Sequence, residues 1–162
     1  MFKDFLNHEL PEFFYHGTNK KFDKFSLEFM GKNFHQSTLG IYFTQYIEPL
    51  PFGTNAKEYA EEMVRREGGK PFIYKCKIHT KNPLILDSND WGSSARFIDK
   101  NRNDIKRYME HDNHDCIIAY DFEEEMRWRE YILATKKLDL IEIVDMFEYK
   151  ENPNTNYFTD VI

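Results

Sequence analysis

Tyr15-His16-Gly17-Thr18 is the first of three short segments that decide how this chain folds. The other two are Gly40-Ile41-Tyr42-Phe43-Thr44 and Glu130-Tyr131-Ile132-Leu133. Each segment places one polar residue inside a run of aromatic, β-branched or small residues, and such a run is typical of a buried strand. Burying a polar side chain without partners costs free energy, so the polar residue in each segment points to a ligand site built on neighbouring strands.

The composition favours one soluble globular domain. The chain has 162 residues, of which 41% are hydrophobic, and this length is sufficient for a proper core. The net charge of −6 gives no general attraction to nucleic acid or to an anionic membrane. No apolar run reaches transmembrane length and the first residues lack the apolar stretch of a signal peptide, so we expect a cytoplasmic protein.

Periodicity predicts a mixed α+β domain in which strands outnumber helices. The clearest helix spans 55–67, with Asn55 as its N-cap, Gly68-Gly69 as its stop and Ala56, Tyr59, Ala60, Met63 and Val64 on its apolar face. The remaining elements predicted are helices at 1–10 and 94–110 and strands at 12–17, 40–44, 72–79, 83–87, 115–120, 129–135 and 139–147. We expect two packed, mostly antiparallel sheets with a cleft between them over residues 1–150, followed by a flexible tail over 151–162.

Three further features lie outside these segments. The long loop at 19–39 carries Phe22, Phe25 and Phe29 as possible anchors. The run His111-Asp112-Asn113-His114-Asp115 has no standard zinc spacing and is interpreted as a polar turn, so no metal is expected. Cys76 and Cys116 lie in apolar runs and are expected to be buried, reduced thiols.

The three segments resemble the ADP-ribosyltransferases of the diphtheria-toxin and poly(ADP-ribose) polymerase branch. That branch carries His, Tyr and Glu on three core strands, in motifs similar to His16-Gly17-Thr18, Gly40-Ile41-Tyr42-Phe43 and Glu130-Tyr131-Ile132. Small bacterial and phage members are the most similar, because they also share Asn82-Pro83-Leu84 and Tyr120-Asp121. The resemblance covers roughly residues 13–147 and implies the ADP-ribosyltransferase fold, with NAD bound in the cleft.

The resemblance also implies a role for each polar residue. Glu130 is expected to hydrogen-bond a ribose hydroxyl of NAD while its charge faces the positive charge that develops on the ribose. His16 suits another ribose hydroxyl, because a neutral imidazole offers one donor and one acceptor. The backbone of Gly17 is expected to hold the nicotinamide carboxamide, and Tyr42 to stack on the nicotinamide ring.

Tyr59 is the expected second tyrosine of that stack, although it also lies on the apolar face of the helix at 55–67. Tyr42 and Tyr59 are 17 positions apart, which is more than is usual in the family. Ala56 stands where polymerase-like members have a serine, so Thr18 or Thr44 is left to supply a missing carboxamide hydrogen bond.

The acceptor is expected beside the loop that leads into Glu130. Arg127, Trp128 and Arg129 in this loop are able to stack on or pair with a nucleic-acid base. The structural alternative is that Trp128 packs inward and that the arginines pair with the glutamates before them.

The function expected from the resemblance is a mono-ADP-ribosyltransferase that modifies a protein or a nucleic acid. Such an enzyme is consistent with a bacterial or phage toxin or effector, with an antitoxin or immunity protein as a partner and no membrane association. An inactive module that binds NAD or ADP-ribose, and an NAD glycohydrolase that uses water as the acceptor, are the alternatives.

Overall fold

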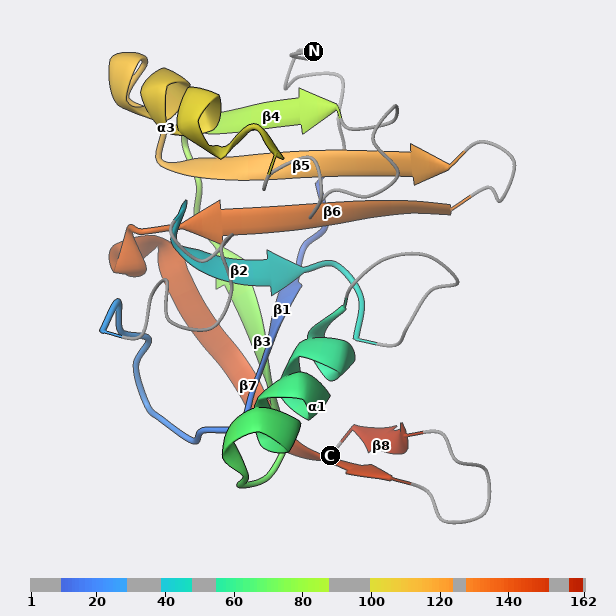
Figure 1. Cartoon of the computed structure of the whole chain (residues 1–162). Coiled ribbons are helices and arrows are strands. Elements are labelled where there is room, and N and C mark those ends of the chain that lie inside the picture. The colour runs from blue at the N-terminus through green and yellow to red at the C-terminus, as the bar shows by residue number, and fades with distance from the viewer. Residues whose placement is uncertain are drawn as a thin grey trace.

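The computed structural model describes residues 10–28, 39–47, 55–87, 100–123, 128–151 and 158–161, and describes the backbone alone at 87, 120–123, 128–130, 150–151 and 158–161. Figure 1 shows the arrangement of the helices and strands. In chain order they are β1 (Phe14–Thr18), β2 (Ile41–Thr44), α1 (Ala56–Glu67), β3 (Phe72–Ile78), β4 (Pro83–Asp87), α3 (Arg102–His111), β5 (Cys116–Glu123), β6 (Trp128–Thr135), the 3-10 helix η4 (Leu138–Leu140), β7 (Ile141–Glu151) and β8 (Phe158–Val161).

The described strands form one sheet in the order β4-β5-β6-β2-β1-β3-β7-β8. Neighbouring strands are antiparallel except for β4 and β5, which are parallel. The α+β class is as predicted, but the two packed sheets are not what the described strands form. One residue pair, Tyr15 opposite Thr44, joins β1 to β2 and makes the sheet continuous. Strand alternation in the sequence reveals apolar faces but not which strand bridges them, so it left the number of sheets undetermined.

The sheet changes direction at that junction. In Figure 1, β4, β5, β6 and β2 run across the molecule, whereas β1, β3 and β7 run steeply past them. One core cluster draws on both halves, with Phe43, Ile118 and Leu133 from one half and Phe14 and Tyr74 from the other. The bend therefore lets two halves of a single sheet bury apolar surface against each other.

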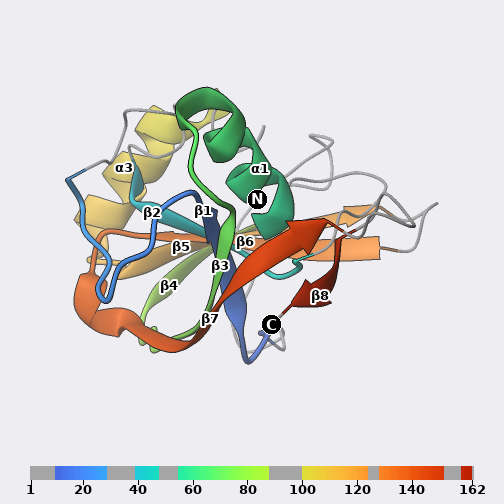
Figure 2. The same ribbon diagram turned by 90° about the horizontal axis from the view of Figure 1, so that it is seen from below.

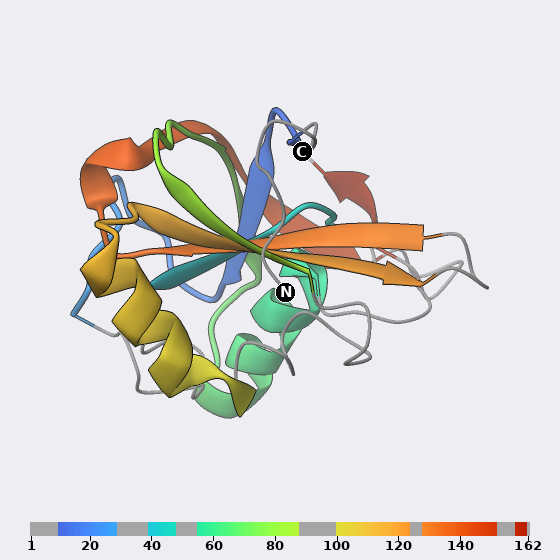
Figure 3. The same ribbon diagram turned by 90° about the horizontal axis from the view of Figure 1, so that it is seen from above.

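Each half of the sheet carries a second apolar cluster. Ile105 and Met109 of α3 pack on the cluster formed by β4, β5, β6 and β2. Ala56 and Ala60 of α1 pack on the cluster that includes Ile73 of β3 and Phe147 of β7. Figures 2 and 3 show α1 and α3 on one side of β5, β6 and β2, with β7 on the opposite side.

Helix α1 confirms the prediction of its two ends. The Asn55 side chain accepts a hydrogen bond from the Glu58 backbone N–H at 3.1 Å, as an N-cap does. The helix stops at Gly68, where φ is 81° and the backbone N–H donates to the Val64 carbonyl. Glycine takes this left-handed conformation without the Cβ clash that other residues suffer.

The largest differences from the predicted elements lie towards the C-terminus. The strand predicted at 139–147 continues as β7 to Glu151 and pairs antiparallel with β8, a strand that the sequence pattern did not predict. The described residues do not test the flexible tail over 151–162, which stays a prediction. The predicted helix at 94–110 is observed as α3 from Arg102, and residues 94–99 and 1–9 lie outside the described residues.

The described helices include none that is both long enough and apolar enough to cross a bilayer.

Candidate active site

The three polar segments lie on three adjacent strands. In the sheet, β6 neighbours β2 and β2 neighbours β1. Thr44 of β2 pairs with Tyr15 of β1 on one side and with Ile132 of β6 on the other, so these three residues lie side by side across the three strands. Position 130 is two residues from Ile132, which places the backbone of Glu130 on β6 beside the end of β2.

Strands β1 and β2 pair only through Tyr15 and Thr44. β1 pairs with β3 at each of its residues from Phe14 to Thr18, but with β2 only at Tyr15. In an antiparallel sheet, the backbone groups of successive residues face opposite neighbours. From His16 to Thr18, β1 and β2 have no further register pair, so the two strands part there.

The His16 side chain connects β1 to β2 beyond their single ladder pair. Its Nδ1 lies 2.6 Å from the Tyr42 carbonyl oxygen, and its ring packs against Phe25 and Phe43, with centroid distances of 5.2 Å and 5.6 Å. Burial lowers the pKa of His16, and the hydrogen bond to the Tyr42 carbonyl opposes this effect only in part. The imidazole is therefore neutral at pH 7.

These contacts determine what the imidazole can offer a ligand. A carbonyl oxygen only accepts, so Nδ1 must carry the proton of the neutral ring. Nε2 is then an acceptor, and it suits a hydroxyl group of a ligand. Protonation at acid pH turns Nε2 into a donor and removes this acceptor.

Gly17 is required by the packing of α1. A Cβ at this position would lie 1.8 Å from the carbonyl oxygen of Ala56 and 2.9 Å from the backbone nitrogen of Ala60. The space beside Gly17 is thus filled by the helix backbone. The absence of a side chain at Gly17 is explained by this helix contact, independently of any approach by nicotinamide.

The first turn of α1 is fully occupied by the chain itself. The N–H groups of Ala56 and Lys57 donate to the carbonyls of Tyr46 and Ile47, at 3.3 Å and 3.2 Å. The next N–H, of Glu58, donates to Asn55. Helix N-termini often bind phosphate, but at this helix those donors are used to anchor the end of the β2 segment.

The other residues predicted to bind NAD are placed as follows. Tyr42 packs against the apolar cluster under α3, and Tyr59 lies half-buried on α1. The Thr18 hydroxyl accepts a hydrogen bond from the Lys20 N–H at 3.3 Å. The buried Thr44 hydroxyl donates to the Tyr46 carbonyl at 2.9 Å, so its proton is used within the fold.

Of the predicted acceptor loop, the structure describes only the backbone of Trp128 and Arg129, which belongs to β6. Arg127 lies outside the described residues, as do the side chains of Trp128, Arg129 and Glu130. Phe29, one of the possible loop anchors, lies outside them as well.

The run at 111–115 anchors a turn. The Asp115 carboxylate accepts hydrogen bonds from the Thr80 hydroxyl and from the backbone N–H groups of Lys81 and Asn82. Burial raises the pKa of Asp115, but these hydrogen bonds outweigh burial and hold the pKa below its usual value. Across the described part of the chain, no three His, Cys, Asp or Glu side chains are grouped to hold a metal ion.

Both cysteines are free thiols and are completely buried. Burial raises the pKa of Cys76 and of Cys116 to about 12, so both remain protonated and unreactive at neutral pH.

Three aromatic residues around His16 were not assigned to the site from the sequence. Phe25 was identified only as a possible loop anchor, and Phe43 and Tyr74 were taken as ordinary strand residues. Tyr74 lies directly opposite His16 in the β1–β3 ladder. The strand alternation of residues 72–78 marks Tyr74 as buried, but only the register between the strands reveals its histidine neighbour.

Comparison with known proteins identifies the family. The chain matches the family described as ADP-ribosyltransferase in polyvalent proteins over residues 8–158. No curated protein and no solved structure matches it. Domains of this family are transferases that use NAD as the ADP-ribose donor. Because the match spans nearly the whole sequence, the chain belongs to the ADP-ribosyltransferase family of polyvalent proteins.

Proposed function

We propose that this protein is a mono-ADP-ribosyltransferase of the His-Tyr-Glu type, which breaks the bond between nicotinamide and ribose in NAD. It then transfers the ADP-ribose to a macromolecule. Residues 1–150 are proposed to act as a single catalytic domain. The observation that carries the proposal is the hydrogen bond from His16 to the Tyr42 carbonyl at the place where β1 and β2 part.

That geometry suits a dinucleotide with ribose hydroxyls. The Nε2 of His16 is left as an acceptor for one hydroxyl, and the backbone of Gly17 is proposed to hold the nicotinamide carboxamide. Tyr42 on the adjacent strand is proposed to stack on the nicotinamide ring, with Tyr59 of α1 on its other face. Thr18 is proposed to contribute its hydroxyl, whereas the committed proton of Thr44 leaves only its oxygen as an acceptor.

Glu130 is proposed as the residue that stabilises the transition state. When the glycosidic bond breaks, its electron pair leaves with nicotinamide and the ribose acquires oxocarbenium character. A carboxylate beside the ribose stabilises that positive charge. A lone pair of the acceptor then forms the new bond to the ribose carbon, and the acceptor releases its proton.

The acceptor is proposed to be a protein or a nucleic acid that approaches beside Arg127, Trp128 and Arg129. These residues immediately precede Glu130 in the sequence, so a target bound there lies close to the reacting ribose. The biological role proposed is that of a cytoplasmic toxin or effector controlled by an antitoxin or immunity protein.

Replacing Glu130 by glutamine tests the mechanism. Glu130→Gln keeps the size and hydrogen-bonding reach but removes the charge, so nicotinamide release from NAD is expected to fall about 10²–10³-fold. The measurement is the initial rate of nicotinamide release at saturating NAD. Glu142→Gln, at an exposed position on β7, is the matched control and should retain full activity. Release by Glu130→Gln at the wild-type rate would contradict the assigned mechanism.

The acceptor class can be determined with NAD labelled in its adenylate part. The protein is incubated with labelled NAD and cell extract, and the products are treated with protease or with nuclease. Label that is lost from the macromolecular fraction only after nuclease indicates a nucleic-acid acceptor, and loss only after protease indicates a protein acceptor. Label found only in free ADP-ribose indicates a glycohydrolase, and binding of NAD without any release of nicotinamide indicates an inactive module.

A further inference from the structure

We propose that Tyr74 and Phe25 are positioning residues for His16, because together they hold residues 19–28 as a fixed wall against the imidazole. The inference rests on the proposed role of His16 in NAD binding and deepens that site. It assigns a function to two aromatic residues: Phe25, which contacts the imidazole, and Tyr74, which contacts Phe25.

The loop begins immediately after the His16-Gly17-Thr18 segment and is tied down at its start. The Lys20 N–H donates to the Thr18 hydroxyl, and the Asn19 side chain donates to the Gly68 carbonyl at 3.1 Å. The second contact joins the loop to the end of α1. The chain therefore leaves β1 in a defined direction.

Tyr74 fixes the middle of the loop through its hydroxyl group. The phenol oxygen accepts a hydrogen bond from the Phe22 N–H at 2.6 Å and donates to the Phe22 carbonyl at 2.9 Å. Burial raises the pKa of Tyr74, so the phenol keeps the proton that it donates. One hydroxyl group thus satisfies both backbone groups of a loop residue that is distant in the sequence.

The ring of Tyr74 holds the same loop residue. Phe22 stacks on Tyr74 with a centroid distance of 4.3 Å and an interplanar angle of 2°. Phe25 then packs edge-on against both rings, at 4.9 Å from Phe22 and 5.6 Å from Tyr74. The loop is therefore held through main chain and side chains alike, and Phe25 has a fixed place.

Phe25, fixed in this way, contacts the ring of His16. The two rings are nearly perpendicular, at 83°, and Phe43 contacts both of them, at 5.6 Å from His16 and 5.4 Å from Phe25. An imidazole with one hydrogen bond can still pivot about it, and contact with these two neighbouring rings restricts that motion. Pre-organised side chains bind a ligand more tightly because less freedom is lost on binding.

Tyr74→Phe is the decisive variant, since it removes one hydroxyl group and preserves the ring. Tyr149→Phe is the matched control, because it removes the hydroxyl of another fully buried tyrosine on β7, in the cluster under α1. Two readouts apply to both variants: the ¹⁵N NMR signals of the His16 ring, which report its tautomer, and the steady-state constants for NAD.

In the wild type, the His16 ring is expected as a single tautomer protonated at Nδ1. In Tyr74→Phe, the two nitrogens should average towards a tautomer mixture, and KM for NAD should rise about tenfold with kcat within about twofold of wild type. Phe25→Leu, which keeps an apolar contact but removes the aromatic edge, should shift the His16 signals in the same direction. Tyr149→Phe should leave the signals and KM unchanged.

Unchanged His16 signals in Tyr74→Phe would overturn the positioning role, whatever the change in stability. Equal changes in Tyr74→Phe and Tyr149→Phe would also overturn it, because they would indicate a general loss of packing. If the wild-type protein neither binds NAD nor releases nicotinamide, the proposed function fails. The NMR readout then still decides whether Tyr74 and Phe25 position the imidazole.

Discussion

The two edges of β1 differ sharply in how they are held. Towards β3, every residue from Phe14 to Thr18 has a partner in the ladder. Towards β2, only Tyr15 has one. The first edge is ordinary sheet structure, and across the second the His16 side chain bonds to the Tyr42 carbonyl.

The edge of β1 that faces β2 is stabilised by a side-chain hydrogen bond and by packing of α1 rather than by ladder pairs. His16 donates to the Tyr42 carbonyl across it, and the N–H groups of Ala56 and Lys57 in the first turn of α1 donate to the carbonyls of Tyr46 and Ile47 just beyond β2. The same helix packs directly on Gly17 of β1. Helix α1 thus bridges the two strands where their backbones separate.

Breaking the contact between α1 and β1 should have the largest effect on the fold. In Gly17→Ala, the added Cβ meets the helix backbone, which cannot move aside as a flexible side chain can. We expect a loss of about 3 kcal/mol in the free energy of unfolding, at the upper end for overpacking, and a parallel loss of NAD binding. Urea unfolding and calorimetric titration with NAD measure the two quantities.

Gly68→Ala separates this steric effect from the loss of a glycine. Its Cβ would meet no atom within 4 Å, but φ is +81°. The expected cost is therefore about 1 kcal/mol of conformational strain, with NAD binding retained. If Gly17→Ala were no more destabilising than Gly68→Ala, α1 would not be the element that joins β1 to β2.

Loosening the start of α1 should have an intermediate effect. Asn55→Ala removes the side-chain cap from the turn that meets Tyr46 and Ile47, at an expected cost of about 1 kcal/mol in the free energy of unfolding. Asn101→Ala is the control at the corresponding position of α3, where the side chain makes no capping hydrogen bond. It should change stability by less than about 0.5 kcal/mol. Equal costs for the two variants would show that capping of α1 does not support the junction.

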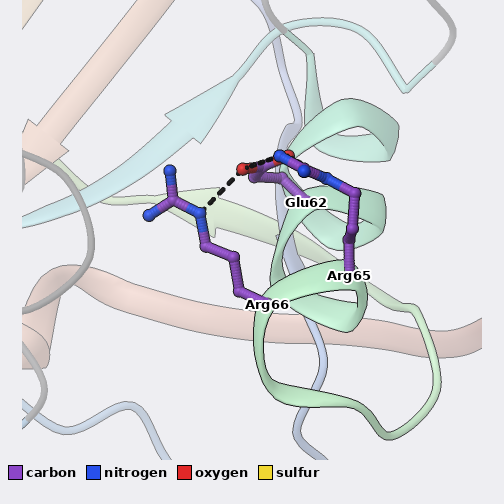
Figure 4. A network of polar contacts seen from close by, with 3 residues as sticks. All are labelled: Glu62, Arg65 and Arg66. Atoms are coloured by element: carbon purple, nitrogen blue, oxygen red, sulfur yellow. Dashed lines mark hydrogen bonds and ion pairs between the residues drawn. The ribbon is translucent and has the colours of Figure 1, made fainter.

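A change on the outer surface of α1 should have the smallest effect. Figure 4 shows Glu62 paired with Arg65 and Arg66 on α1. The two ion pairs measure 2.5 Å and 2.7 Å, and both arginines are exposed. Exposed ion pairs are screened by salt and contribute little to stability. Glu62→Gln should therefore leave nicotinamide release unchanged and shift the thermal unfolding midpoint least of the variants above. A large drop in activity would mean that α1 acts through its outer face.

The prediction from sequence was most accurate where local pattern decides the structure. Asn55, the spacing of apolar residues and Gly68-Gly69 defined α1 almost to the residue, because caps and helical periodicity are properties of neighbouring positions. The three motif strands were also found, and they are adjacent in the sheet. Two sheets were expected where the described strands form one, because the single pair between Tyr15 and Thr44 leaves no local signal.

For the candidate site, the sequence proposed His16 and Tyr42 but did not reveal how they are joined. It also proposed that Gly17 contacts the ligand, and the structure adds that the helix backbone fills the space where its side chain would lie. It gave Tyr74 no role, although the ladder places that residue opposite His16 and its hydroxyl holds Phe22. Each of these contacts joins residues that are far apart in the chain.

The sequence by itself determined the identity of the polar residues, the alternation that buries their strands and the limits of α1, since these depend on residues a few positions apart. Only the tertiary structure decided which strands are joined by a single pair, which carbonyl fixes the histidine tautomer and which aromatic rings contact it. The physical reason is that a hydrogen bond such as the one from His16 to Tyr42 depends on strand register and helix packing, and these are set by the whole sheet at once.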